Sequence, residues 1–131
     1  MAKLKRSQVS SGASWEDIVG YSRGVRVGNI IEISGTTAVD EKDIIHGVND
    51  FYEQTKFIIR KAEKALIELG SGLKDVVRTR IYTTNIVEWE AIGKAHGESF
   101  RSIKPAATMV EVSKLINQDT LVEIEFTAIC N

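Results

Sequence analysis

Two glutamates, Glu123 and Glu125, alternate with apolar residues in the segment LVEIEFTAIC. In an extended strand, residues two apart lie on one face, with their Cα atoms about 6.8 Å apart. Two carboxylates on one surface can divide the acid and base roles of a reaction between them. The same spacing is typical of ion-paired or solvated strand residues, and the two glutamates by themselves favour that second interpretation.

A second candidate is the run of small polar residues Ser34-Gly35-Thr36-Thr37, which follows a predicted strand. Its backbone N–H groups are placed to receive an anion or a carbonyl oxygen, although an ordinary turn has the same composition. His96 lies on the apolar face of a predicted helix, where a lone histidine is more typical of structure than of catalysis. The sequence contains no G-x-S-x-G, P-loop, G-x-G-x-x-G or H-E-x-x-H motif.

Composition limits the partners and cofactors that we expect. A single cysteine, Cys130, and two histidines fifty residues apart, His46 and His96, predict no disulfide and no zinc site. The net charge of −1 argues against a dedicated surface for nucleic acid or anionic membranes. No apolar run approaches the roughly 20 residues that span a bilayer, and residues 1–14 lack the apolar centre of a secretory signal. We therefore expect a cytoplasmic protein that needs no metal or organic cofactor.

The elements that must position these residues follow from hydrophobic periodicity. A hairpin is predicted over 21–34, with Gly28-Asn29 at its turn, and further strands over 75–85, 106–113 and 120–130. Helices are predicted over 49–70, capped by Asn49 or Asp50, and over 88–100. The 131 residues then form a single domain, with a flexible tail over about 1–14. The order β-β-α-β-α-β-β predicts an α+β protein of two layers, with both helices on one face of the sheet.

Alternation predicts which side chains face the helices. In the last strand these are Val122, Ile124, Phe126, Ala128 and Cys130, and in the strand over 75–85 they are Val77, Thr79 and Ile81. Apolar residues of the second helix, Trp89, Ile92 and Phe100, share a face with His96. The outer face of the sheet then mixes glutamates and arginines with leucine and isoleucine, which favours contact with another subunit over bare solvent.

Three segments in order resemble the RidA/YjgF family of reactive intermediate deaminases: GYSRGVRVGNIIEISGTTA, LKDVVRTRIYTTN and KPAATMVEVSKL…LVEIEFTAI. The likeness runs from about residue 20 to 129. It implies a chorismate-mutase-like fold, a mixed sheet backed by two helices. It also implies a homotrimer with clefts between subunits that hydrolyse enamines and imines to a 2-keto acid and ammonia, without a cofactor. The family is also known as endoribonuclease L-PSP.

The resemblance assigns roles to individual positions. The first acid of VEIE, Glu123, matches the glutamate that activates water, and Tyr21, Ser34 and Gly35 match the family's ligand-binding positions. The motif that reads PARS in the deaminases is Pro105-Ala106-Ala107-Thr108 here, so Ala107 stands where an arginine grips the substrate carboxylate. Further departures are Gly20 for proline, Thr36 for glutamine and Gly93 for asparagine.

The alanine at position 107 weakens the expectation of a 2-imino acid substrate. An arginine–carboxylate contact is bidentate, and each hydrogen bond to a charged group contributes about 1.5–3 kcal/mol. Lys104, Arg80 or His96 are candidates to compensate. A cleft walled by Ala107 and Thr108 is less cationic, so we expect the pKa of Glu123 to be raised. Hydrolysis of a differently charged imine or enamine and binding of a small metabolite without turnover both remain open, and ribonuclease activity is disfavoured.

Overall fold

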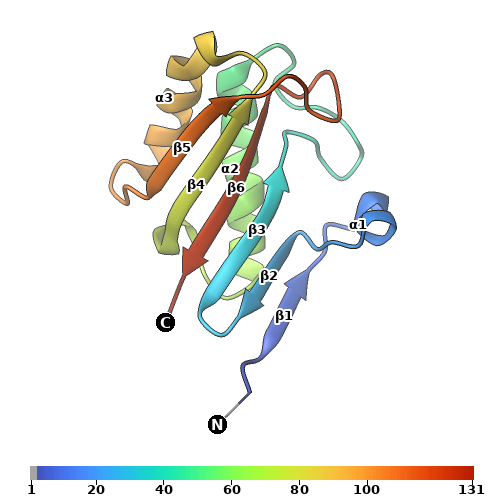
Figure 1. Ribbon diagram of the computed structural model, residues 1–131, viewed down its shortest axis with the longest axis vertical. Helices are drawn as coiled ribbons and strands as arrows, with labels where there is room; N and C mark the ends of the chain where they lie inside the picture. The colour runs from blue at the N-terminus through green and yellow to red at the C-terminus, as the bar shows by residue number, and fades with distance from the viewer. Residues whose placement is uncertain (1–2) are drawn as a thin grey trace.

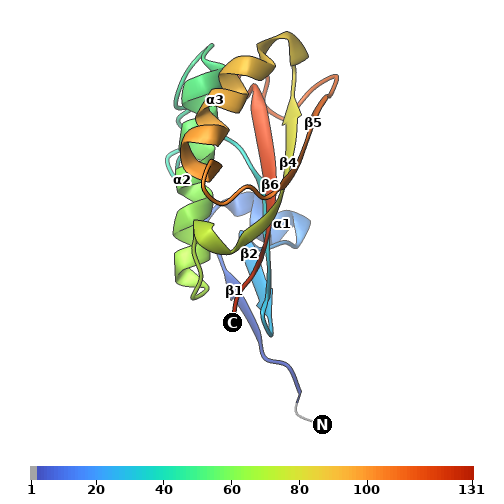
Figure 2. The same cartoon turned by 90° about the vertical axis from the view of Figure 1, so that its left-hand side faces the viewer.

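The computed structural model describes residues 3–131 and folds them into a sheet covered on one face by two helices (Figures 1 and 2). The elements in chain order are β1 Arg6–Val9, α1 Ser14–Val19, β2 Gly24–Val27, β3 Ile30–Thr36, α2 Phe51–Glu68, β4 Val76–Thr83, α3 Trp89–Phe100, β5 Ala106–Glu111 and β6 Val122–Ile129. Single turns of 3-10 helix at Leu73–Asp75 and Ile86–Glu88 precede β4 and α3. The predicted α+β class with two layers is confirmed.

The sheet is mixed and has the strand order β1-β2-β3-β6-β4-β5. Neighbouring strands are antiparallel except β4 and β5, which are parallel and are joined through α3. The strand β6 lies between β3 and β4, with Ile33 opposite Phe126 on one side and Thr79 opposite Phe126 on the other. Residues from distant parts of the chain therefore meet around β6.

The long helix α2 forms as its pattern predicts. The side chain of Asp50 accepts a hydrogen bond of 2.9 Å from the Glu53 N–H and so caps the helix. Its buried face, which includes Ile58, Ala62 and Leu66, packs on the helix-facing side chains of β3 and β6. The alternation predicted for β6 is confirmed, because Val122, Ile124, Phe126, Ala128 and Cys130 are all buried.

Two predicted inward-facing side chains are wrong. Trp89 begins α3 and is 55% exposed, because the first turn of this helix extends beyond the core that receives Ile92 and Phe100. Val77 is 42% exposed, because a bulge between Val76 and Arg78 shifts the register of β4 against β6. Val76 is buried in its place.

Part of the expected flexible tail is ordered structure. Residues 6–9 form β1, which pairs antiparallel with β2 from Arg6 opposite Val27 to Val9 opposite Gly24. Residues 14–19 form α1, a helix of under two turns that ends at Gly20 in the left-handed conformation. Residues 1 and 2 lie outside the described residues. This N-terminal segment is therefore packed beside β2 and β3, where it can contribute to a site.

Among the helices of residues 3–131, none combines the length and the apolar character that crossing a membrane requires.

Candidate functional site

The Glu123 carboxylate lies on the outer face of the sheet, against the backbone of Gly35. A Cβ built on Gly35 would stand 2.0 Å from Oε2 of Glu123, a distance that no real pair of atoms of this kind allows. Gly35 is in the irregular part of β3, where the pairing with β6 shifts between Ile33 and Thr36. The bulge and the missing side chain together make room for the carboxylate, which accepts no hydrogen bond from any residue in 3–131.

The surroundings of Glu123 favour its protonated form. Burial raises the pKa of its carboxyl group above the ordinary value, the positive charge of Arg23 opposes that shift, and the negative charge of Glu125 adds to it. Glu125 is itself held by Tyr82, whose hydroxyl donates a hydrogen bond of 2.6 Å to it. The expected rise in the Glu123 pKa is confirmed in direction, and its first cause is burial. A carboxyl group whose pKa is raised in this way is better suited to give a proton to a ligand than an ordinary glutamate.

Arg23 is a residue of this site that the sequence interpretation missed. Its Nη2 donates a hydrogen bond of 2.7 Å to the carbonyl oxygen of Gly35, and its guanidinium lies 5.9 Å from the centre of the Tyr21 ring. Its Nε is buried and has no hydrogen-bond partner among the described residues. The only sequence signal for it was its place two residues after Tyr21, within the segment that carries the family resemblance.

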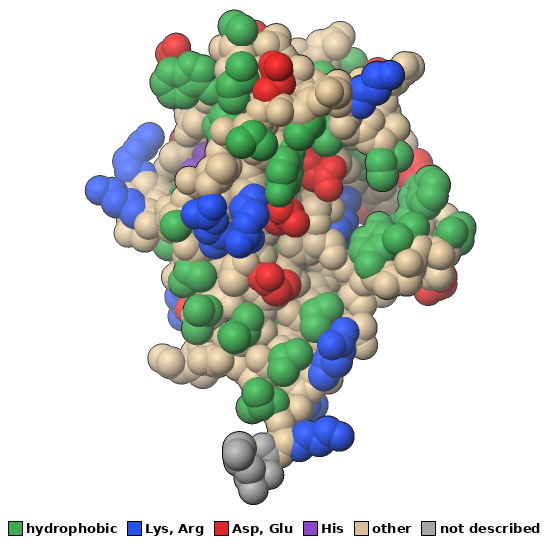
Figure 3. Space-filling view, viewed as in Figure 1, with side chains coloured by type: hydrophobic (Ala, Val, Ile, Leu, Met, Phe, Trp, Pro, Cys, Tyr) green, Lys and Arg blue, Asp and Glu red, His purple; other side chains and the backbone are tan. Residues whose placement is uncertain are grey.

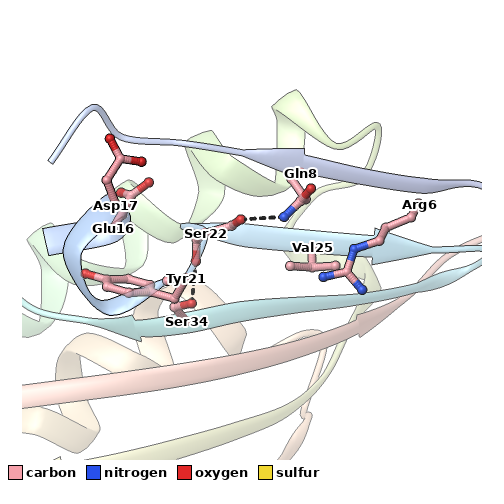
Figure 4. Close-up of a pocket in the computed structure, with 9 residues that line it drawn as sticks. Arg6, Gln8, Glu16, Asp17, Tyr21, Ser22, Val25 and Ser34 are labelled. Carbon is pink, nitrogen blue, oxygen red and sulfur yellow. Dashed lines mark hydrogen bonds between the residues drawn. The ribbon is translucent and has the colours of Figure 1, made fainter. Parts of the chain in front are cut away.

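Tyr21 and Ser34 line a groove of about 420 Å³ on the outer face of β1, β2 and β3 (Figure 4). Acidic side chains from α1, Glu16 and Asp17, lie at one end of this groove and Arg6 lies at the other. The groove is also lined by Gln8, Gly20, Ser22 and Val25. Glu123 is not among the residues that line the groove. The groove borders the Gly35 site through Ser34, which precedes Gly35, and through Tyr21, which lies beside Arg23.

The donors of Ser34 are used within the chain. Its backbone N–H donates to the Arg23 carbonyl at 3.0 Å, and its hydroxyl donates to the Ser22 carbonyl at 2.6 Å (Figure 4). Thr36, the next polar residue of this strand, is fully buried and donates to the Ser34 carbonyl at 2.8 Å. These residues therefore fix the shape of the bulge around Gly35.

Glu16 explains why the N-terminal segment stays in place. Its side chain is only 4% exposed and accepts hydrogen bonds from the backbone N–H and the hydroxyl of Ser11. Burial alone would raise its pKa, but the hydrogen bonds from Ser11 and Ser10 outweigh burial and lower it. The Glu16 carboxylate is thus an ionised group that secures α1 beside Tyr21.

Within one chain, Ala107 and Thr108 lie far from Glu123. Ala107 is opposite Thr79, whereas Glu123 is opposite Tyr82, and β4 separates the two strands. Two strand spacings of about 4.8 Å and three residues of about 3.3 Å place their Cα atoms roughly 14 Å apart. Thr108 instead accepts a hydrogen bond of 2.5 Å from Arg78.

The three residues considered as substitutes for the missing arginine make no hydrogen bond or ion pair with Glu123 in residues 3–131. Arg80 lies opposite Glu125 and Thr108 on the outer face and is exposed. His96 is on the opposite, helix-covered side, where its Nε2 lies 3.0 Å from the Thr79 hydroxyl and burial lowers its pKa. Lys104 joins His96 around a hollow of about 270 Å³ at the end of α3.

Comparison with known proteins gives a consistent result. The sequence matches the family described as Endoribonuclease L-PSP over residues 11–130. The crystal structure of Rv2704 from Mycobacterium tuberculosis, a member of the YjgF/YER057c/UK114 family, superimposes with a TM-score of 0.87 at 43% identity. The match covers 96% of this chain and 100% of that one. The mixed sheet with two helices is therefore the predicted chorismate-mutase-like fold.

Two further relatives each cover more than four fifths of the chain. An uncharacterized protein of Streptomyces coelicolor, SCO2049, is 37% identical over 92% of this chain and 90% of its own length. The 3-aminoacrylate deaminase RutC of Acinetobacter baylyi is 31% identical over 82% of this chain and 85% of its own length.

Proposed function

The chain belongs to the endoribonuclease L-PSP family, the RidA/YjgF proteins, and from this premise we propose that it hydrolyses a small imine or enamine beside Glu123. The observation that carries the proposal is the Glu123 carboxyl group, which has a raised pKa and no hydrogen-bond partner within residues 3–131 and lies in space left by Gly35. The enamine class has support from the relative named 3-aminoacrylate deaminase, because 3-aminoacrylate is an enamine.

The proposed reaction needs one proton donor and one proton acceptor. The neutral Glu123 acid protonates the enamine carbon or the imine nitrogen, which makes the carbon of the C=N bond electrophilic. The resulting carboxylate removes a proton from water as its oxygen attacks that carbon, and a carbinolamine forms. The re-protonated acid then gives its proton to the carbinolamine nitrogen, the C–N bond breaks, and the hydroxyl proton returns to the carboxylate as ammonia and a carbonyl compound are released. One carboxyl group with a raised pKa serves each of these transfers in turn.

We propose that the cleft is completed by a second subunit of a homotrimer. The distance between Ala107 and Glu123 in one chain supports this arrangement, because a small ligand does not span roughly 14 Å. The outer face of the sheet also supports it. There the half-exposed pair Ile30 and Ile129 lies among arginines and glutamates, and Figure 3 shows hydrophobic and charged side chains interspersed over this face.

Binding of a small metabolite without turnover is a second candidate. The observation that favours it is Ala107, because a cleft without the arginine of that position holds a carboxylate less firmly. Endoribonuclease activity, which the family description names, has less support. The net charge is −1, and the arginines on the outer face lie beside carboxylates rather than in a continuous basic surface.

Ammonia release tests the proposed reaction. Imines generated in situ by an amino-acid oxidase are supplied to the wild-type protein and to the variants Glu123→Gln and Glu125→Gln. We expect faster ammonia release with the wild type, loss of that acceleration in Glu123→Gln, and retention of most of it in Glu125→Gln. Equal rates with and without wild-type protein would reject hydrolysis of the imines supplied. A rise in Tm with an unchanged metabolite would then favour binding alone.

A further inference from the structure

Arg23 and Glu123 both lie against Gly35 and yet make no hydrogen bond to each other. The Arg23 guanidinium binds the Gly35 carbonyl, while the Glu123 carboxylate lies against the Cα of the same glycine. The ion pair found within residues 3–131 joins Asp40 to His46, and Glu123 accepts no hydrogen bond from Arg23. The two groups interact electrostatically: an ionised Glu123 raises the pKa of Arg23, and Arg23 lowers the pKa of Glu123. The guanidinium and the carboxyl group therefore contact the same glycine without binding each other.

Other partners for Arg23 are already engaged. Glu16 is a neighbouring carboxylate that interacts with Arg23 over a distance, but Ser11 supplies its hydrogen bonds. Burial lowers the pKa of Arg23, and the carboxylates of Glu16 and ionised Glu123 only partly oppose that effect. Of the five N–H donors of a guanidinium, the Nη2 contact to Gly35 uses one. A partly buried cation with so few partners is stabilised when an anion binds to it.

The free end of the guanidinium is oriented for such an anion. The bond from Nη2 to Gly35 fixes the plane of the group, and Nη1 is bonded to no described residue and is not among the fully buried atoms. The Tyr21 ring, 5.9 Å away, borders the guanidinium on another side. A carboxylate bound to Arg23 is therefore held beside Gly35, the residue against which Glu123 lies, and the neutral form of Glu123 does not repel it.

We infer that Arg23 binds the anionic group of the ligand in this cleft, from the same subunit as Glu123, and so supplies the cation that is missing at Ala107. The inference rests on the proposed function for the location of the cleft. It names a substrate class, a small imine or enamine that carries a carboxylate. It also makes Arg23 a residue that determines specificity for charge rather than a proton donor.

Isothermal titration with two probes of the same shape tests this inference. Pyruvate carries a carboxylate, and pyruvamide is its neutral counterpart. We expect the wild type to bind pyruvate at least about tenfold more tightly than pyruvamide, and Arg23→Gln to lose that preference. Arg23→Lys keeps the charge without the planar fork and is expected to retain an intermediate preference. It also serves as the test variant if Arg23→Gln does not fold.

Arg26→Gln is the matched control. Arg26 lies in β2, three residues after Arg23, and donates a bond of the same length, 2.7 Å, to the Leu69 carbonyl on the helix-covered side. It should keep the wild-type preference for pyruvate. Absence of pyruvate binding to the wild type, equal binding of the two probes, or an undiminished preference in Arg23→Gln would each overturn the inference. Glu123→Gln separates the two proposals: it should lose ammonia release but still bind pyruvate through Arg23.

Discussion

The Glu123 carboxylate fills the space that a side chain at position 35 would take: a Cβ on Gly35 would lie 2.0 Å from Oε2 of the glutamate. The contact is between a backbone carbon and the far end of a side chain, so a methyl group at position 35 displaces the carboxylate and not the strand. Gly35 does not have a positive φ, so alanine is compatible with its backbone. The glycine is therefore a determinant of where the carboxylate sits.

The variant Gly35→Ala tests whether the position of the Glu123 carboxylate matters for the rate independently of the stability of the fold. A displacement of about 1 Å can lower a rate about 10²-fold, so we expect a loss of that order in kcat/KM for ammonia release. The free energy of unfolding should change by less than about 1 kcal/mol, because the side chain can rotate away. Gly72→Ala is the control, since nothing lies within 4 Å of its Cβ position. A Gly35→Ala protein with unchanged kcat/KM would show that Glu123 does not act from this position.

The raised pKa of Glu123 predicts how stability depends on pH. A carboxyl group with a higher pKa in the folded state stabilises the fold below the ordinary value of 4.5, and this contribution disappears as pH rises through the folded pKa. Glu123→Gln, which stays neutral, should therefore have a higher Tm than wild type at pH 7.5 and a similar Tm near pH 4. Calorimetry over this range tests it, with Glu68→Gln at the exposed end of α2 as control. A constant difference across pH would contradict the prediction.

An arginine at position 107 should rescue the loss of Arg23. If a neighbouring subunit brings residue 107 to the cleft, Ala107→Arg in the Arg23→Gln background restores the preference for pyruvate over pyruvamide. The gain is that of a hydrogen bond to a charged group, about 1.5–3 kcal/mol. Titration of the double variant measures it, and Val110→Arg on the outer edge of the same strand is the control. No gain in the double variant would place residue 107 outside the cleft.

The proposed trimer depends on the outer face of the sheet. Ile30 and Ile129 lie opposite each other there and are each about half exposed. Ile129→Lys should therefore convert trimers to monomers, because a lysine buried without a partner is costly. Light scattering after size exclusion gives the mass. Ile67→Lys, on the exposed side of α2, should leave the mass unchanged. A monomeric wild type would reject the trimer outright.

Much of the fold was predictable from the sequence because the pattern and the packing agree. The alternation in β6 and the helical spacing from Ile58 to Leu66 each describe a single buried face. Val77 was assigned to the wrong face because a bulge breaks the alternation of β4. No residue type in that segment is typical of a bulge, so the sequence did not predict it. The strand β1 was missed because its four residues, RSQV, are mostly polar and pair at an edge of the sheet.

The site was less predictable than the fold. Glu123 and Gly35 were candidates by their residue types and spacing, and the family resemblance assigned their roles. Their contact depends on a register shift that only the three-dimensional pairing defines. Arg23 was missed because an arginine near a turn is ordinarily exposed. Its partial burial comes from packing of α1, Tyr21 and β3, which lie together only in the folded chain.

The central place of β6 also has a consequence for synthesis on the ribosome. The strands β1 to β3 and the pair β4 and β5 are made first, but they share no sheet edge until β6 is inserted between β3 and β4. Until then β3 and β4 each present unpaired backbone groups that can join another chain. Folding of this protein is therefore expected to be completed after translation of β6, and chaperones that protect open strand edges should act on the nascent chain before that point.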